Sequence, residues 1–379
     1  MLYLDHAATS PVRPEVLEAM RPYLTDAFGN PSSHHTVGER AADALEHARA
    51  QVAAALGMRA NDVIFTAGGT EANNLAVKGI VLGGERRRLI TTEIEHESVL
   101  ESAAYLQRFH GVEVVRMPVD ADGRIRPEAL SEALTDETAL VSFAHANNEI
   151  GTVQDAAALT AVAHAQGVPV HVDAVQSAGW VDLRALGRDA GVDAISIAGH
   201  KLGAPKGTGV LAVRSRVPLE PLLHGGGQER GRRSGTENVA GAVALATALA
   251  LAEADRERDA AVIAAMTSEF IARVLAAVPS ATLTGSAEHR LPNLASFTFA
   301  GTSGEAVLLE LERRGVVSSS GSACAAGSDE PSPVLLALGI PPETAQTAVR
   351  FTFGRAPLPD GSAAQLAALV AASVTAVAG

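Results

Sequence analysis

The feature that most constrains this fold is an alternation of short apolar segments with longer helical patterns through the first 215 residues. The apolar, β-branched segments predict strands at Val63–Thr66, Leu89–Thr92, Glu113–Arg116, Leu140–Ala144, Val168–Val172, Ala194–Ile197 and Gly209–Val213. The patterns between them predict helices at Thr70–Val81, Ser98–Phe109, Glu128–Leu134, Ala156–Ala165 and Leu183–Gly187. Such alternation indicates an α/β domain with a mostly parallel sheet.

The chain changes character after a loop rich in glycine and arginine at 224–236. A long helical pattern then extends from about Asn238 to Ala277, and we expect an interruption within it. The last hundred residues predict strands at Ala295–Phe299, Val316–Ser319 and Ala348–Phe353, with helices at Gly304–Arg314 and at the alanine-rich end. These segments predict a second, smaller α+β domain.

Composition narrows the class of protein and its compartment. Hydrophobic residues make up 47% of the chain, and a net charge of −13 argues against nucleic acid or an anionic membrane as the main partner. The single cysteine, Cys324, excludes an internal disulfide framework and a thiolate metal cage. The sequence opens without a basic leader, and its apolar stretch Val239–Ala252 is too short to span a bilayer. We therefore expect a cytoplasmic protein.

Only three of the 30 basic residues are lysines, and one of them, Lys201, follows a predicted strand. Asp173 also ends a predicted strand, and open α/β sheets place ligands at the carboxyl ends of their strands. A lysine and an aspartate placed in this way are typical of a Schiff-base site for pyridoxal phosphate, in which the aspartate holds the pyridinium proton. The alternatives are a surface lysine and an aspartate that caps a helix.

Two further motifs follow predicted strands. Gly69 and Thr70 lie where a strand leads into a helix, so backbone N–H groups there can bind phosphate; an ordinary turn capped by Thr70 is the alternative. His96 follows another strand and could stack on a planar cofactor, or simply be satisfied by its neighbours at a helix start. No metal-binding motif accompanies the 12 histidines, so we expect no metal site.

Cys324 lies in the segment Ser318-Ser319-Ser320-Gly321-Ser322-Ala323-Cys324-Ala325-Ala326-Gly327-Ser328. Most lone cysteines are buried small hydrophobic residues, but this one has small residues around it and glycines on both sides. The pattern favours an accessible thiol, whose thiolate fraction is strongly nucleophilic.

Together these motifs resemble the cysteine desulfurases of the class V aminotransferase group, and the resemblance covers nearly the whole chain. The motifs are Tyr3-Leu4-Asp5-His6-Ala7-Ala8-Thr9, Gly29-Asn30-Pro31-Ser32-Ser33, Gly69-Thr70-Glu71-Ala72-Asn73-Asn74, Glu95-His96, Asn147-Asn148-Glu149-Ile150-Gly151, His171-Val172-Asp173-Ala174-Val175-Gln176, Gly199-His200-Lys201, Arg233-Ser234-Gly235-Thr236, Ser320-Gly321-Ser322-Ala323-Cys324 and Arg350-Phe351.

The resemblance implies the fold type I architecture of pyridoxal-phosphate-dependent transferases, assembled as a homodimer. The large cofactor domain, with a mostly parallel seven-stranded sheet, is expected at 13–250. The smaller α+β domain is expected at 1–12 and 251–379, with the cysteine loop at about 318–333.

The resemblance also implies roles for individual residues. Lys201 would form the Schiff base and act as general base, Asp173 would pair with the pyridine nitrogen, and His96 would stack on the ring as a further catalytic residue. The remaining implied contacts are Gln176 and Asn148 to the ring oxygen, Gly69, Thr70, His200 and the partner's Thr236 to the phosphate, and Arg350 with Asn30 to the substrate carboxylate. At Ala198 many members carry a hydroxyl, so we expect one fewer phosphate bond.

The implied activity removes sulfur from L-cysteine, giving L-alanine and a persulfide on Cys324. The acceptor would serve iron–sulfur cluster assembly, tRNA thiolation or a thio-cofactor pathway, and Cys324 could transiently ligate a transferred cluster. Alternatives are a selenocysteine lyase, a small-substrate aminotransferase, or a non-catalytic sulfur carrier or scaffold-binding protein.

Overall fold

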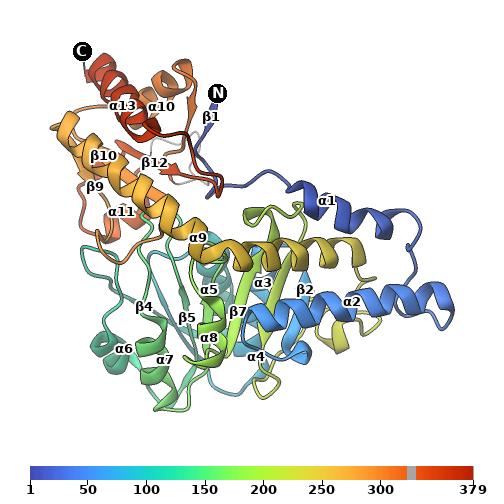
Figure 1. The fold of residues 1–379 in the computed structure, drawn as a ribbon. Helices are drawn as coiled ribbons and strands as arrows, with labels where there is room; N and C mark the ends of the chain where they lie inside the picture. Colours follow the sequence, from blue (N-terminus) through green and yellow to red (C-terminus); the bar gives the residue numbers. More distant parts are fainter. Residues whose placement is uncertain (322–329, 379) are drawn as a thin grey trace.

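The computed structural model describes residues 1–321 and 330–378 (Figure 1). Cys324 therefore lies outside the described residues, together with the rest of 322–329, which is half of the expected cysteine loop.

A seven-stranded sheet forms the centre of the larger part of the molecule (Figure 1). Its spatial order is β2 (Val63–Thr66), β8 (Gly209–Val213), β7 (Ala194–Ala198), β6 (Val170–Asp173), β5 (Thr138–Ala144), β3 (Arg88–Thr92) and β4 (Glu113–Met117). Every neighbouring pair is parallel except the two that β8 makes. The predicted mostly parallel α/β sheet is confirmed.

Helices cover both faces of this sheet, which explains why its central strands are almost continuously apolar. One face packs against α2 (Thr36–Ala55), α6 (Pro127–Ala133), α7 (Ala156–His164), α8 (Leu183–Arg188) and the first part of α9 (Val239–Ala277). The other face packs against α3 (Gly69–Asn74), the π-helix η3 (Leu75–Gly79), α4 (Ile80–Gly83) and α5 (Glu97–His110). All residues of β7 and β8 are buried between these layers.

A second hydrophobic core lies beside the first and is built mainly from the C-terminal residues (Figure 1). An antiparallel sheet in the order β12 (Ala348–Thr352), β10 (Leu294–Phe299) and β9 (Ala281–Leu283) packs on α10 (Gly304–Arg313), α13 (Ser362–Ala378) and the end of α9. Phe270 contacts Phe297, Phe351 and Phe353 edge to face in this core.

The N-terminal segment contacts the second core. Strand β1 (Leu2–Tyr3) pairs in parallel with β11 (Val316–Val317), and Leu4 is buried among the apolar side chains of that core. The remaining short helices are α1 (Pro14–Met20), η1 (Arg21–Leu24), η2 (Ala60–Asp62), η4 (Gly199–Lys201), η5 (Glu229–Gly231), α11 (Pro333–Ala337) and α12 (Pro342–Ala345).

Helix α9 joins the two cores and differs from expectation, because its 39 residues form one uninterrupted helix. After Gly241 the helix contains no glycine and no proline, so nothing in its backbone breaks it. By length and composition α9 could cross a membrane. However, it packs on α2 and α13, and its middle carries the charged stretch 255–259, so it is a core helix. The domain boundary at 250 stays a prediction.

Candidate active site

Lys201 lies where the carboxyl end of β7 turns into η4. The turn requires glycine at position 199, because a Cβ there would collide with the Thr208 hydroxyl. Burial lowers the pKa of Lys201 to about 8, with Asp173 opposing that shift. Among the described residues, Lys201 makes no hydrogen bond or ion pair. It thus presents an amine that is easily deprotonated, next to a carboxylate.

Asp173 ends β6, the strand beside β7, and is almost fully buried. Its Oδ2 accepts a hydrogen bond of 2.7 Å from Asn73 Nδ2, and its Oδ1 accepts one of 2.9 Å from the Val175 N–H. The Asn73 amide also donates to Ser98 Oγ at 2.9 Å. These bonds fix the carboxylate, and no cation in the described part of the chain forms an ion pair with it. The carboxylate can therefore pair with a protonated ring nitrogen.

Asn73 was not among the predicted site residues. The signal was its position in α3, three residues after Thr70 and so on the same side of the helix.

His96 caps the start of α5, where its Nδ1 accepts the Ser98 N–H at 3.0 Å. Burial lowers the pKa of His96, an effect that Asp173 opposes and Lys201 reinforces. The ring is therefore neutral at physiological pH. It lines the same pocket as Asp173 and Lys201, as a ring that stacks on a planar cofactor would.

Gly69, Thr70 and His200 line the pocket together with Ala198, so three of the four predicted phosphate residues lie at one place. A Cβ on Gly69 would lie 2.9 Å from Val175 Cγ2, and this close approach explains the glycine. His200 Nδ1 lies 3.1 Å from Thr9 Oγ1, and burial lowers the pKa of His200 to about 4. Ala198 offers no hydroxyl here.

The residues present fit pyridoxal phosphate. A buried amine for the aldehyde, a buried carboxylate for the ring nitrogen and a helix start for the phosphate all line one pocket. Its lining residues are Gly69, Thr70, Asn73, His96, Ser98, Asp173, Val175, Ala198, His200 and Lys201. Among the described residues, no group of three histidine, cysteine, aspartate or glutamate side chains is placed to hold a metal ion.

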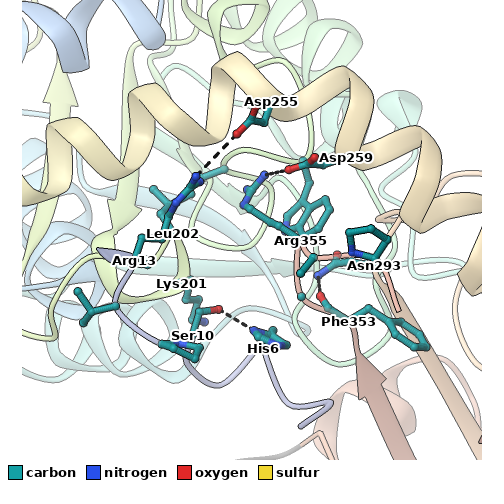
Figure 2. A pocket seen from close by; sticks show the side chains of 18 of the residues that line it. His6, Ser10, Arg13, Lys201, Leu202, Asp255, Asp259, Asn293, Phe353 and Arg355 are labelled. Atoms are coloured by element: carbon teal, nitrogen blue, oxygen red, sulfur yellow. Dashed lines mark hydrogen bonds and ion pairs between the residues drawn. The ribbon is translucent and has the colours of Figure 1, made fainter. Parts of the chain in front are cut away.

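Lys201 also lines a second, larger cavity of about 630 Å³ (Figure 2). His6 and Ser10 line its N-terminal side, and Arg355 lies over the Trp180 ring at 4.5 Å. Gln176 also lines this cavity, and its Nε2 donates to the Ala7 carbonyl at 3.1 Å. The lysine is thus reachable from two sides.

Arg350 lies outside both cavities in this chain. Its Nη2 donates to Asp5 Oδ1 at 2.7 Å, and its Nη1 donates to the carbonyls of Asn148 at 2.8 Å and Gly321 at 3.1 Å. Among the described residues, its Nε alone finds no hydrogen-bond partner. A substrate carboxylate would therefore have to replace Asp5. Asn148 contributes its backbone here, and its side chain lines neither cavity.

Two further predicted residues, Thr236 and Asn30, also line neither cavity. Thr236 is exposed and lines neither cavity, and Asn30 is exposed with its Oδ1 accepting the Ser32 N–H at 2.9 Å. Cys324 lies outside the described residues.

Known proteins are similar to this chain over most of its length. The family model described as aminotransferase class-V matches residues 2–357. A cysteine desulfurase IscS from Dictyoglomus turgidum is 42% identical over 93% of this chain and 89% of its own length. An IscS-like cysteine desulfurase from Mycobacterium tuberculosis is 43% identical over 93% and 91%.

Solved structures with the same fold are also similar to this chain. A NifS-like protein superposes with a TM-score of 0.91 at 32% identity, covering 99% of this chain and 100% of its own. SspA in complex with cysteine superposes with a TM-score of 0.83 at 35% identity, covering 94% and 100%.

Fold and site together define a pyridoxal-phosphate-dependent enzyme of fold type I. The chain belongs to the aminotransferase class-V family.

Proposed function

We propose that this enzyme, a cysteine desulfurase, holds the sulfur of L-cysteine as a persulfide on Cys324 and passes it to an acceptor protein. The observation that carries the proposal is the buried Lys201 amine beside Asp173 in a pocket that fits pyridoxal phosphate. The relatives named cysteine desulfurase, and the similar solved structure that contains cysteine, support L-cysteine as the substrate.

The residues of the pocket divide the first half of the reaction between them. Pyridoxal phosphate, when bound, stabilises negative charge that develops at the substrate Cα. Lys201 takes the Cα proton, and its pKa of about 8 keeps a neutral fraction available near neutral pH. With the cofactor bound, Asp173 would hold a proton on the ring nitrogen, and the neutral His96 ring would stack on the cofactor ring. Arg350 exchanges Asp5 for the substrate carboxylate.

Sulfur transfer follows at Cys324. Its thiolate attacks the substrate sulfur, so an S–S bond forms while the substrate C–S bond breaks. The electron pair of the C–S bond stays on the substrate Cβ, which takes a proton. Lys201 returns a proton to Cα, and L-alanine is released. An acceptor thiolate then takes the outer sulfur of the persulfide and returns Cys324 to its thiolate form.

A second copy of the chain completes the phosphate site in this proposal. Thr236 is exposed and away from its own chain's pocket, which supports its donation to the partner's site. Leu17, Leu24 and Phe28 expose large apolar side chains on and after α1, and these would be covered in a dimer.

We place the enzyme in the cytoplasm, where its one thiol stays reduced. Its acceptor serves cluster assembly or thiolation.

The test is Cys324→Ser. We expect this variant to bind pyridoxal phosphate with unchanged absorbance yet to release no alanine from L-cysteine at an appreciable rate. Turnover that persists in the variant would overturn the nucleophile assignment. A 2-oxoacid in place of alanine would instead indicate a transaminase.

A further inference from the structure

Glu149 lies close to described residues on both sides of the segment 322–329, which contains Cys324. Ser332 Oγ donates a 2.6 Å hydrogen bond to Glu149 Oε2 in a buried position. Gly321 comes just before residue 322, and a Cβ built on it would lie 3.5 Å from Glu149 Cβ and Oε2. One carboxylate therefore bonds Ser332 and lies close to Gly321, which stand on opposite sides of 322–329.

Glu149 is itself firmly held at the edge of the large sheet. The side-chain oxygen of Asn147 accepts the N–H of Glu149 at 2.8 Å and that of Ile150 at 3.0 Å. The Asn147 amide donates at 2.8 Å to the carbonyl of Ile94, just beyond the end of β3. The carboxylate thus extends from a backbone turn fixed to the edge that carries the cofactor pocket.

Ser332 links Glu149 to the helix that follows the Cys324 segment. Its hydroxyl also accepts the Leu335 N–H at 3.3 Å, so the same oxygen begins α11 and bonds Glu149. Glu149 and Ser332 are both buried, so water does not compete for the hydrogen bond between them.

Arg350 bonds Gly321, the last described residue before the Cys324 segment. Its Nη1 bonds the carbonyls of Gly321 and Asn148, the residue before Glu149. Burial raises the pKa of Glu149, while Ser332 and Arg350 oppose the shift and Glu97 adds to it. The two flanks are therefore fixed to neighbouring residues of one turn.

We propose that Glu149 and Ser332 are positioning residues for sulfur transfer, because they fix the C-terminal flank of the Cys324 segment to the edge of the sheet that carries Lys201. This inference depends on Cys324 being the nucleophile of the proposed function. Fixing both ends of a short segment raises the effective concentration of a group within it, and freeing one end lowers that concentration.

The experiment compares Ser332→Ala with Ser303→Ala in the full-length enzyme with cofactor bound. Ser303 also caps a helix, α10, through its hydroxyl, so the control loses a cap without a bond to glutamate. We expect Ser332→Ala to lower kcat for alanine release about tenfold, with KM and the absorbance change on binding L-cysteine unchanged. Ser303→Ala should match the wild type, and Ser332→Thr, which keeps the hydroxyl, should restore kcat.

Glu149→Asp provides a second test that does not remove the helix cap, because it keeps the charge and shortens the side chain by one methylene group. We expect the same loss of kcat, and the double variant with Ser332→Ala should fall no further than either single variant. Equal kcat in Ser332→Ala and Ser303→Ala, a rise in KM alone, or additive losses would overturn the inference. A wild type that releases no alanine would instead overturn the proposed function.

Discussion

Lys201 lies at the end of β7 with its amine buried, and this burial lowers its pKa to about 8. A neutral amine is needed to attack an aldehyde, so the rate at which the cofactor-free protein captures pyridoxal phosphate should rise with pH and level off above about 8. The measurement is the growth of cofactor absorbance after mixing, across a pH series. A midpoint near the ordinary lysine value of 10.5 would contradict the burial argument.

Glu95 provides a separate test of burial at the scale of one residue. Burial raises the pKa of Glu95 to about 8, a shift that Thr92, at 2.5 Å, opposes and Asp173 adds to. The folded protein therefore keeps a proton that the unfolded chain releases above its ordinary value of 4.5. The contribution of Glu95 to the free energy of unfolding is therefore fully present at low pH. It is lost progressively as pH rises from about 4.5 to 8.

Glu95→Gln replaces the carboxyl group with an amide, which does not titrate. We expect its unfolding free energy, relative to wild type, to improve by about 3 kcal/mol between mildly acidic and mildly alkaline pH. Denaturant unfolding at both pH values measures this difference. Glu93→Gln, an exposed control two residues away, should show no such change. Parallel curves for Glu95→Gln and wild type would be the contrary result.

The sequence could predict Lys201, Asp173 and His96 because each follows a strand, and the ends of parallel strands meet at one edge of a sheet. It could not predict that Arg350 pairs with Asp5, since 345 residues separate them and only the folded chain brings β12 to the N-terminus. The motif predicted that Arg350 binds the substrate carboxylate, whereas in the structure Arg350 already binds the carboxylate of Asp5.

At the scale of elements, strand β8 supports the turn at the phosphate cradle. Gly209 begins β8, and a Cβ there would lie 2.5–2.6 Å from the backbone of Gly68. Gly209→Ala must therefore push the turn that presents Gly69 and Thr70.

We expect Gly209→Ala to raise the apparent Kd for pyridoxal phosphate at least about tenfold, the equivalent of about 1.4 kcal/mol. Equilibrium titration of the cofactor-free protein checks this. Gly84→Ala is the matched control, because its new Cβ would meet nothing closer than 3.8 Å. Equal Kd values for the two variants would show that the turn tolerates displacement.

The seven strands could be predicted because strands buried on both faces appear as short apolar runs. Helix α9 was predicted wrongly as interrupted. Its charged stretch 255–259 resembles a solvent loop, yet it lies where the helix passes between the two cores, and no proline or glycine breaks it. Pairing of β1 with β11 could not be predicted from two residues per strand.

For the molecule as a whole, the N-terminal segment connects the two cores. Asp5 bonds Arg350, while Gln176 donates to the Ala7 carbonyl and His200 contacts Thr9. The Arg350 side chain is 2% exposed, so loss of its partner leaves a buried charge unpaired.

Asp5→Asn should therefore lower the unfolding free energy by about 2–4 kcal/mol. The exposed pair Glu269–Arg273 offers the control: Glu269→Gln should change it by less than about 1 kcal/mol. Thermal or denaturant unfolding distinguishes the two. Equal effects would mean that the Asp5 contact adds nothing beyond a surface ion pair.

The central claim is that this site moves a sulfur atom from L-cysteine to Cys324. One equivalent of L-cysteine added to the cofactor-bound enzyme, without an acceptor, should give one equivalent of L-alanine and a protein heavier by one sulfur atom. Peptide mass spectrometry should place that atom on Cys324. Alanine without a persulfide on Cys324, or a persulfide that still forms when Lys201 is replaced by arginine, would contradict the account.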